Sequence, residues 1–171
     1  MSIKMPSKKD LSKIIAALKA DSNNTTIDWK TQLNCNQNYF KELSEIDYRG
    51  EYLLYIACKQ KTFNLVKALI LNGADVNKPS KTFGTTPLQI AFKKNDFKTA
   101  YLLYRYGANL YYINKPYTAR HIEYYDNHKY AYDVKFYAQT NKAKQLFSLL
   151  EELEKDKANA KVKSEIEKLC I

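Results

Sequence analysis

The stretch "LNGADVNKPSKTFGTTPLQIA", residues 71–91, decides how this chain of 171 residues folds. It holds two of the chain's four glycines and two of its four prolines, directly before an apolar run. Glycine tolerates the positive φ that ends many helices, and proline fits the first helical turn, where its missing N–H costs nothing. We therefore expect Gly73 to end one helix and Pro87 to begin the next. Pro79 and Gly84 shape the loop between them.

The glycines repeat with one period. Gly50 and Gly84 are 34 residues apart, and so are Gly73 and Gly107. When the chain is laid out on this period, apolar residues coincide at Leu54 and Leu88, Ile56 and Ile90, Ala57 and Ala91, Phe63 and Phe97, and Leu69 and Leu103. A fixed period of roughly 20–50 residues indicates stacked structural repeats.

Each repeat unit is predicted to be a pair of helices. In the second unit Thr86 is a good N-cap, and a short buried helix follows it. Asn95 and Asp96 interrupt the apolar pattern, and a second amphipathic helix then runs to Gly107. The unit is therefore expected to be a helical hairpin that is joined to its neighbours by loops.

These units resemble the ankyrin repeat. "TPLQIA" at residues 86–91 is similar to the family's T-P-L-H-x-A helix start, with Gln89 in place of His. "LVKALILNGADVN" at residues 65–77 is similar to its V-x-x-L-L-x-x-G-A-D-V-N end. The resemblance implies an all-α fold, an ankyrin-repeat solenoid of stacked helix pairs with finger loops and divergent terminal caps. The first unit departs from the pattern, and the spacing of 34 rather than about 33 predicts an insertion near residues 78–83.

A third unit is eroded, and two interpretations of it stay open. "YTARHIEYYDNH", from residue 117, places Thr118, Ala119 and His121 where the family has Thr, Pro and His. Residues 130–155 are then either the second helix of this unit followed by an extra helix, or a degraded fourth unit that begins near Tyr130. We prefer the first.

The flanks are predicted to cap the array. Residues 1–46 form a divergent helical cap, which could be a worn repeat, with a first helix at residues 10–20 that is capped by Asp10. Residues 47–138 hold about three ankyrin units, and residues 139–171 form a capping helix with a charged tail. Terminal repeats need a polar outer side because no neighbour covers it.

The charge of +10 is concentrated in the centre of the chain. Residues 47–138 carry fourteen Lys or Arg against seven acids, which is +7 of the +10. This distribution predicts an acidic partner. A polyanion, either nucleic acid or an anionic membrane, is the alternative, although the basic residues are scattered rather than clustered.

The sequence predicts no enzyme, metal or cofactor. The three cysteines have no C-x-x-C spacing, and together with the two histidines they form neither a zinc pattern nor a catalytic triad. An odd number of cysteines fits a reducing compartment with free thiols. Cys58 aligns with Phe92, where an apolar side chain packs. His121 falls where the family's histidine orders the loop. All four glycines already serve the repeat, so no phosphate-binding loop remains.

The resemblance implies a protein-binding surface along the concave side of the array. The family's contact positions correspond here to Tyr48, Arg49, Glu51, Lys59 and Gln60 in unit one, to Thr82, Phe83, Thr85, Lys93 and Lys94 in unit two, and to Asn114, Lys115, Tyr117 and Tyr125 in unit three. Aromatic and arginine side chains are common interface anchors. Phe83 is the strongest candidate, because an apolar ring on a finger has no core to fill.

The excess of Lys, Asn, Tyr and Ile is typical of an AT-rich genome. With it, the chain resembles ankyrin effectors that intracellular bacteria deliver into host cells, and an ankyrin protein of poxvirus or eukaryotic origin is the alternative. "EELE" at residues 151–154 is similar to a glutamate-rich secretion signal, although a solvated helix explains these acids equally well. We expect a monomer in the cytoplasm, which would be the host cytosol for a secreted effector. An oligomeric scaffold that forms through the tail helix is the alternative. No apolar run approaches the length of a membrane span.

Overall fold

The structure is a computed structural model that describes residues 7–20, 37–113 and 133–171. The described residues form mostly helices and one short hairpin. In chain order the elements are α1 (Lys8–Ala20), α3 (Gln37–Glu45), β1 (Asp47–Tyr48), β2 (Glu51–Tyr52), α4 (Leu53–Lys59), α5 (Phe63–Leu71), α6 (Pro87–Lys93), α7 (Phe97–Arg105), α9 (Val134–Tyr137), α10 (Asn141–Lys155) and α11 (Ala160–Leu169). This confirms the predicted all-α class.

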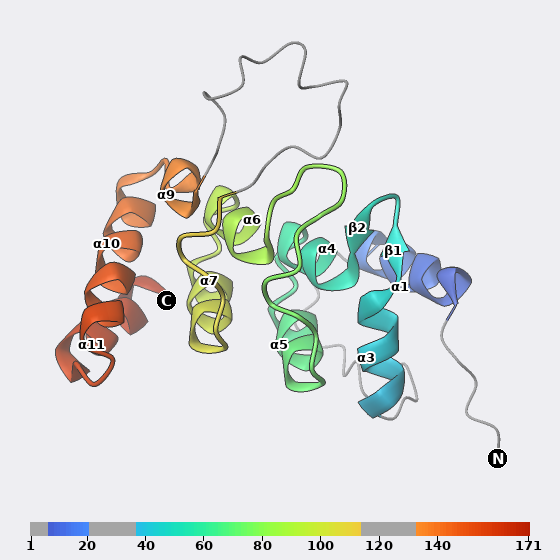
Figure 1. The fold of residues 1–171 in the computed structure, drawn as a ribbon, viewed down its shortest axis with the longest axis horizontal. Coiled ribbons are helices and arrows are strands. Elements are labelled where there is room, and N and C mark those ends of the chain that lie inside the picture. The colour runs from blue at the N-terminus through green and yellow to red at the C-terminus, as the bar shows by residue number, and fades with distance from the viewer. Residues whose placement is uncertain (1–6, 21–36, 114–132) are drawn as a thin grey trace, which may run out of the picture.

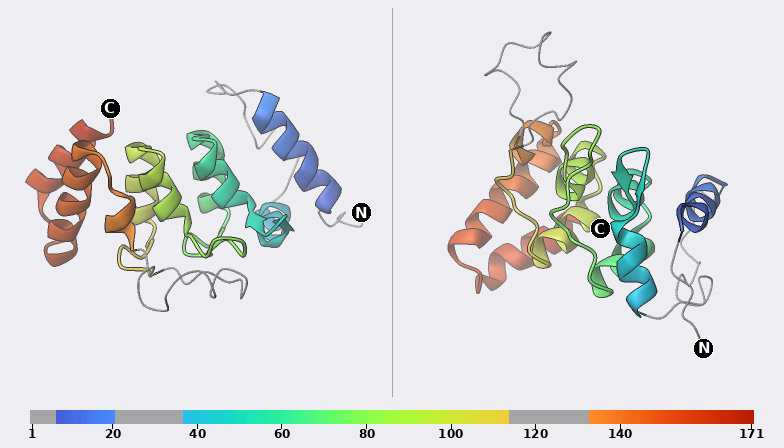
Figure 2. Two further views of the ribbon diagram at one scale, coloured as in Figure 1. Left: turned by 90° about the horizontal axis from the view of Figure 1, so that it is seen from above. Right: turned by 45° about the vertical axis from the view of Figure 1, so that its right-hand side comes forward.

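The helices stack as antiparallel pairs along the long axis of the molecule (Figures 1 and 2). Helix α4 pairs with α5 and α6 pairs with α7, while α4 packs on α6 and α5 packs on α7. The loop from α5 to α6 rises beside the β1–β2 hairpin, so both fingers lie on one side of the stack (Figure 1). The predicted solenoid with finger loops is therefore present.

Local capping explains where α6 begins. The Thr86 hydroxyl accepts a hydrogen bond from the Gln89 N–H at 3.3 Å, and the Gln89 Oε1 accepts one from the Thr86 N–H at 2.9 Å. This capping box satisfies two N–H groups that the helix itself leaves unpaired, with Pro87 in the first turn. The Gln89 side chain also donates to the Tyr112 carbonyl at 2.9 Å, which ties α6 to the loop after α7.

Gly73 and Gly107 hold matching places in neighbouring hairpins, as the period predicts. Gly73 follows α5 and has a φ of +86°, and Gly107 follows α7 and has a φ of +88°. Two residues further on, the Asp75 side chain accepts from the Asn77 N–H, and the Asn109 side chain accepts from the Tyr111 N–H. The same turn chemistry therefore closes both units.

Aliphatic residues at helical spacing fill the space between the pairs. Those without exposed surface include Leu53, Leu65, Leu69, Leu88, Leu103, Leu146 and Leu150. Burying one such side chain contributes about 1.5–3 kcal/mol, so the shared core is the main force that holds the pairs together.

The first helix starts earlier than expected. Helix α1 begins at Lys8, and Ser7 rather than Asp10 precedes it. The Ser7 hydroxyl accepts from the Asp10 N–H at 3.3 Å, and the Asp10 carboxylate accepts from the Ser7 N–H at 3.0 Å. The prediction of Asp10 as the N-cap was therefore wrong, because the acid takes the reciprocal role three residues inside the helix.

Helices α9 and α10 continue the two rows of the stack. Helix α9 packs on α6 and on α10. Lys98, the second residue of α7, lies 4.7 Å from the Phe63 ring centre, and Lys142, the second residue of α10, lies 5.4 Å from that of Phe97. The outer helices α5, α7 and α10 thus share one register. Helices α9 and α10 form a further helix pair, which spans the predicted boundary at residue 138. The start of the unit in either interpretation, at Tyr117 or near Tyr130, lies outside the described residues.

Candidate partner-binding site

The first finger is the β1–β2 hairpin. Its strands pair Asp47 with Tyr52 and Tyr48 with Glu51, which leaves Arg49 and Gly50 as a two-residue turn. The Gly50 N–H donates to the Asp47 carboxylate at 3.2 Å. The Arg49 guanidinium lies 5.4 Å from the centre of the Tyr48 ring, within cation–π range.

The second finger, residues 76–85, packs beside this turn. The Lys81 N–H donates to the Gly50 carbonyl at 2.7 Å, and the Thr82 hydroxyl donates to the Arg49 carbonyl at 3.1 Å. The Lys81 ammonium bonds to the Asp47 carboxylate at 2.8 Å, and this hydrogen bond raises the Lys81 pKa. Two segments about one period apart therefore hold each other in place.

A groove lies between α1, the two fingers and α4. Its volume is about 330 Å³. We call it the finger groove, and it is lined by Ile15, Tyr48, Arg49, Glu51, Ile56, Lys59, Gln60, Thr82 and Phe83. Seven of these nine residues are contact positions that the sequence analysis selected.

Phe83 projects from the second finger. Its side chain is 54% exposed, although the finger around it is well ordered by hydrogen bonds. The Ser80 hydroxyl accepts from the Phe83 N–H at 3.1 Å, and the Ser80 carbonyl accepts from the Gly84 N–H at 2.8 Å. A rigid backbone that presents an exposed ring loses little entropy when a partner covers it.

Three predicted contact residues in the described part do not line this groove. Lys93 and Lys94 are exposed at the end of α6, one unit further along the stack. Thr85 is buried, and its hydroxyl donates to the Tyr55 hydroxyl at 3.1 Å. Thr85 therefore has a packing role that its position on the finger did not reveal. Asn114, Lys115, Tyr117 and Tyr125 lie outside the described residues.

Ile15 and Ile56, each of which is 4% exposed, line the groove although they are not among the contact positions predicted from the sequence. Ile56 faces the groove from α4, and the repeat period marks it only as an apolar position that it shares with Ile90. Ile15 comes from α1, and nothing in the local sequence predicts that α1 packs against the first finger and α4.

Positively charged side chains outnumber negatively charged ones in the finger groove. Lys59 forms a 2.7 Å salt bridge with Glu51. In the described ranges, the other salt bridges join Lys78 to Glu45 and Lys81 to Asp47. Arg49 takes part in none of these pairs, so it gives the groove its unbalanced positive charge.

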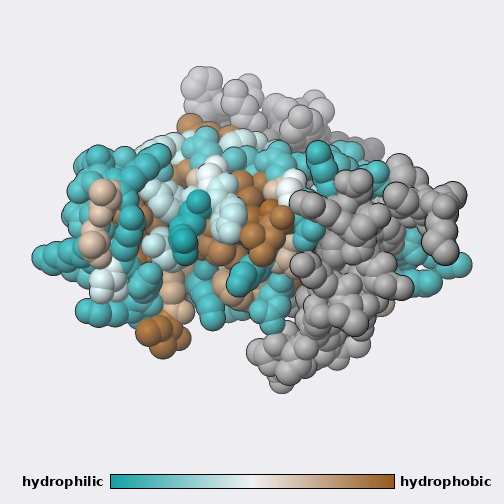
Figure 3. Space-filling view, turned by 90° about the horizontal axis from the view of Figure 1, so that it is seen from below, coloured by the Kyte–Doolittle hydropathy of each residue, from teal (hydrophilic) through white to brown (hydrophobic). Residues whose placement is uncertain are grey.

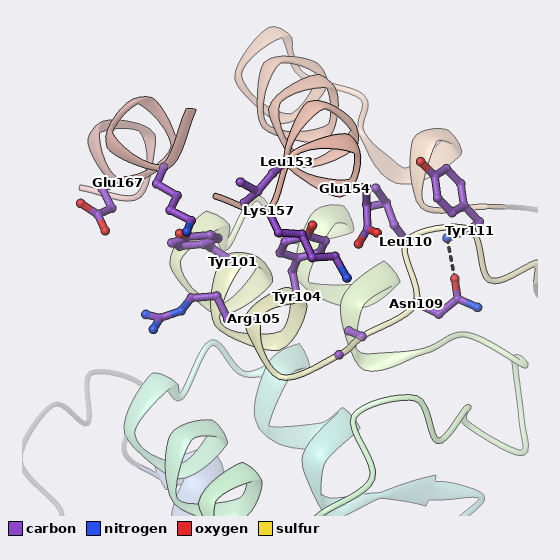
Figure 4. A pocket seen from close by; sticks show the side chains of 13 residues that line it. Tyr101, Tyr104, Arg105, Asn109, Leu110, Tyr111, Leu153, Glu154, Lys157 and Glu167 are labelled. Carbon is purple, nitrogen blue, oxygen red and sulfur yellow. Dashed lines mark hydrogen bonds between the residues drawn. The ribbon is translucent and has the colours of Figure 1, made fainter. Parts of the chain in front are cut away.

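A second cavity of about 620 Å³ lies where α7 meets the C-terminal helices. Figure 4 shows Tyr101 and Tyr104 on α7 below Leu153 and Glu154 of α10, while the Arg105 side chain points away from them. Burial and a hydrogen bond to Glu154 raise the Tyr104 pKa. The cavity's charged lining mixes Arg105, Lys157 and Lys163 with Glu154 and Glu167, so its electrostatics favour no one class of ligand.

Large apolar side chains are exposed at several other places. Besides Phe83 they are Leu71, Tyr106, Tyr111, Ile113, Phe136 and Ile171. On the side opposite the fingers, the visible surface is mostly hydrophilic, with an apolar area near its centre (Figure 3). Neither feature combines an aromatic anchor, an unbalanced charge and a hollow, as the finger groove does.

Cysteine chemistry and metal binding find no support in the described residues. Cys58 is fully buried, and burial raises its pKa well above the usual value, so its thiol stays protonated and inert. Within the described ranges, no group of three or more His, Cys, Asp or Glu side chains is placed to hold a metal. The helices in those ranges are too short or too polar to cross a membrane.

Comparison with known proteins agrees with this geometry. A family model described as ankyrin repeats, in three copies, matches residues 14–114, which is more than half of the chain. The match begins inside the predicted N-terminal cap and ends before the predicted third unit at residue 117. A search of curated proteins finds no match to the chain. Ankyrin repeats are generic protein-interaction modules and typically are not enzymes. The matched residues, the stacked helix pairs and the paired fingers together place this chain in the ankyrin-repeat family.

Proposed function

We propose that this chain binds a partner protein through the finger groove. The observation that supports this is the convergence of seven predicted contact residues on one hollow. The groove joins an exposed aromatic ring, Phe83, to an arginine, and these two residue types often carry the binding energy of interfaces.

The partner is proposed to be acidic where it meets the array. Arg49, Lys93 and Lys94 are exposed, and none of them belongs to the salt bridges found among the described residues. Positive groups along a docking surface attract an acidic partner and raise its association rate. The overall charge of +10 acts in the same direction.

Quantitative affinity capture from cell lysate tests the site. The immobilised baits are the wild type, a Phe83→Ala variant, a Phe83→Ala, Lys93→Glu, Lys94→Glu triple variant, and a Tyr106→Ala control. Tyr106 is 47% exposed at the end of α7, outside the groove, so it matches Phe83 as an exposed aromatic residue. Proteins that bind through the groove are lost from both variants that carry Phe83→Ala, whereas proteins lost from the triple variant alone bind through the lysines at the end of α6. If the same proteins elute from the triple variant and the wild type, the groove is not the binding site.

A salt titration separates a protein partner from a polyanion. Binding to an oligonucleotide or to anionic vesicles should weaken steeply and linearly in the logarithm of salt concentration. A captured protein that is anchored by Phe83 should lose only part of its affinity between 50 and about 300 mM salt, because apolar burial is not screened.

A role as a bacterial effector in the host cytosol extends this proposal, on the sequence resemblance given above. The acids of "EELE" lie in α10, where Leu153 is buried and Glu154 bonds to Tyr104. A translocation reporter fused to the chain tests delivery. Loss of the signal in a Glu151→Gln, Glu152→Gln variant that folds normally would support the secretion role, and unchanged delivery would remove these acids from it.

A further inference from the structure

The turn of the first finger carries a residue that its backbone does not favour. Arg49 has a φ of +54° and Gly50 a φ of +79°. Two positive φ angles in a two-residue hairpin loop are the mark of a type I′ turn, for which Asn-Gly is the preferred pair. An arginine in the left-handed region costs stability, because its Cβ crowds the backbone.

The structure holds this unfavourable residue firmly. The Thr82 hydroxyl donates to the Arg49 carbonyl, and the Lys81 N–H donates to the Gly50 carbonyl. The side chain remains exposed and lines the finger groove. A residue kept in strain with an exposed side chain that joins no salt bridge among the described residues is a reason to look for a function.

The finger groove places Arg49 beside apolar side chains, and the one carboxylate of its lining, Glu51, is paired with Lys59. The buried Ile15 and Ile56 side chains contribute apolar lining, and Phe83 adds an aromatic ring. The other cation of the lining, Lys59, is already paired with Glu51. A volume of about 330 Å³ is near the lower end for ligand sites, so it has room for one or two side chains of a partner rather than a whole helix.

We infer that Arg49 determines the specificity of the finger groove by binding a carboxylate that adjoins a large apolar side chain on an extended acidic peptide segment. The apolar side chain packs against Ile15, Ile56 and Phe83. The carboxylate accepts two hydrogen bonds from the planar guanidinium, which a lysine or asparagine cannot supply in that geometry. This inference rests on the proposed function, and it explains why the turn keeps a residue that weakens it.

Two asparagine substitutions separate binding from strain. Arg49→Asn gives the turn its preferred residue and removes the guanidinium. Lys61→Asn is the matched control, because Lys61 also has a positive φ, +57°, is exposed, and lies outside the groove. Asn95 already occupies the equivalent place one period later, with a φ of +53°. Both variants should raise the thermal midpoint by about 2 °C, since asparagine tolerates this region better.

The probe is a random 12-residue peptide library displayed on phage and selected on the wild-type protein. Selected peptides are synthesised, and their affinities for the wild type and for the Arg49→Asn, Lys61→Asn and Phe83→Ala variants are measured by fluorescence anisotropy. The selected peptides should share Asp or Glu next to Leu, Ile, Met or Phe. Arg49→Asn should weaken their binding at least about tenfold, as loss of a charged hydrogen-bonded pair does, while Lys61→Asn leaves it unchanged.

The outcomes distinguish the inference from the proposed function. Peptides that need Phe83 but bind Arg49→Asn as tightly as the wild type, or that lack the acidic–apolar pair, overturn the role of Arg49 and leave the groove in place. If the selected peptides bind Phe83→Ala as tightly as the wild type, or if no peptide is enriched over an unrelated bait, the finger groove is not the binding site. The inference about Arg49 then fails with it. An Arg49→Asn variant that melts no higher than the wild type refutes the link between strain and function.

Discussion

Asn77 holds the loop of the next repeat unit through Asn109, 32 residues away. The Asn77 Oδ1 accepts a hydrogen bond from the Asn109 N–H at 2.7 Å. The Nδ2 of the same side chain donates to the Gly107 carbonyl at 2.9 Å. One amide thus satisfies a donor and an acceptor of the neighbouring turn, and links two units whose helices also pack together.

Removing this amide should loosen the junction between units. Asn77→Ala loses both hydrogen bonds and is expected to lower the free energy of unfolding by about 1–2 kcal/mol, since each such bond contributes about 0.5–1.5 kcal/mol. Asn77→Asp keeps the acceptor for the Asn109 N–H and loses the donor, so its loss should be smaller. Urea denaturation measures both. Equal losses in the two variants would show that the bond to Asn109 contributes nothing.

The glycines of the fingers and of the helix ends should respond differently to substitution. A Cβ at Gly50 would lie 2.5 Å from the Thr82 Oγ1, whereas a Cβ at Gly73 meets no atom within 4 Å. Gly73→Ala should therefore cost only the backbone strain, about 1 kcal/mol. Gly50→Ala should cost about 2–3 kcal/mol, because the second finger must also move.

A double-mutant cycle checks the cause of the Gly50 effect. When Thr82→Ala is present, Gly50→Ala should cost no more than Gly73→Ala does, since the clashing hydroxyl is gone. Additive effects of the two substitutions in chemical denaturation would assign the loss to the backbone alone.

Thr85 should matter for stability and not for binding. Thr85→Val leaves the buried Tyr55 hydroxyl without the donor that it has now, which should cost about 1–3 kcal/mol. Adding Tyr55→Phe removes the orphaned group and should recover part of the loss. Peptides selected on the wild type should bind Thr85→Val with unchanged affinity, and a loss of affinity would return Thr85 to the contact set.

The reactivity of Cys170 should depend on pH in a defined way. Burial raises the Cys170 pKa to about 11, partly offset by Lys142. Because the folded state favours the neutral thiol, this contribution to stability is complete below the usual thiol pKa near 9 and is lost as the pH rises toward 11.

Alkylation with iodoacetamide, followed by mass spectrometry, measures this dependence. In a Cys35→Ser background, Cys170 labelling should rise with a midpoint near pH 11, and Cys58 should label only when the chain unfolds. The same protein in urea provides the control, where both thiols should titrate near 9. A folded-state midpoint near 9 would show that the partial burial of Cys170 does not raise its pKa.

The positions of the candidate site were partly accessible from sequence. Tyr48, Arg49, Thr82 and Phe83 fall on fingers whose places follow from the glycine period, so a family pattern could select them. The strain at Arg49 could not be seen in this way, because it depends on the register of the β1–β2 hairpin. The burial of Thr85 could not be seen either, because sequence position does not tell an exposed finger residue from one that bonds inward to Tyr55.

By itself the sequence determined the repeat. A helix starts at Thr86, and helices end at Gly73 and Gly107, because residues a few positions away satisfy the backbone groups at those ends. Such local contacts recur wherever the sequence pattern recurs. The tertiary structure alone decided what the repeats enclose. Ile15 reaches the finger groove, and α9 stacks on α6, only because apolar burial brings together segments that are distant in sequence. That force is non-directional, so no local pattern records which surfaces it joins.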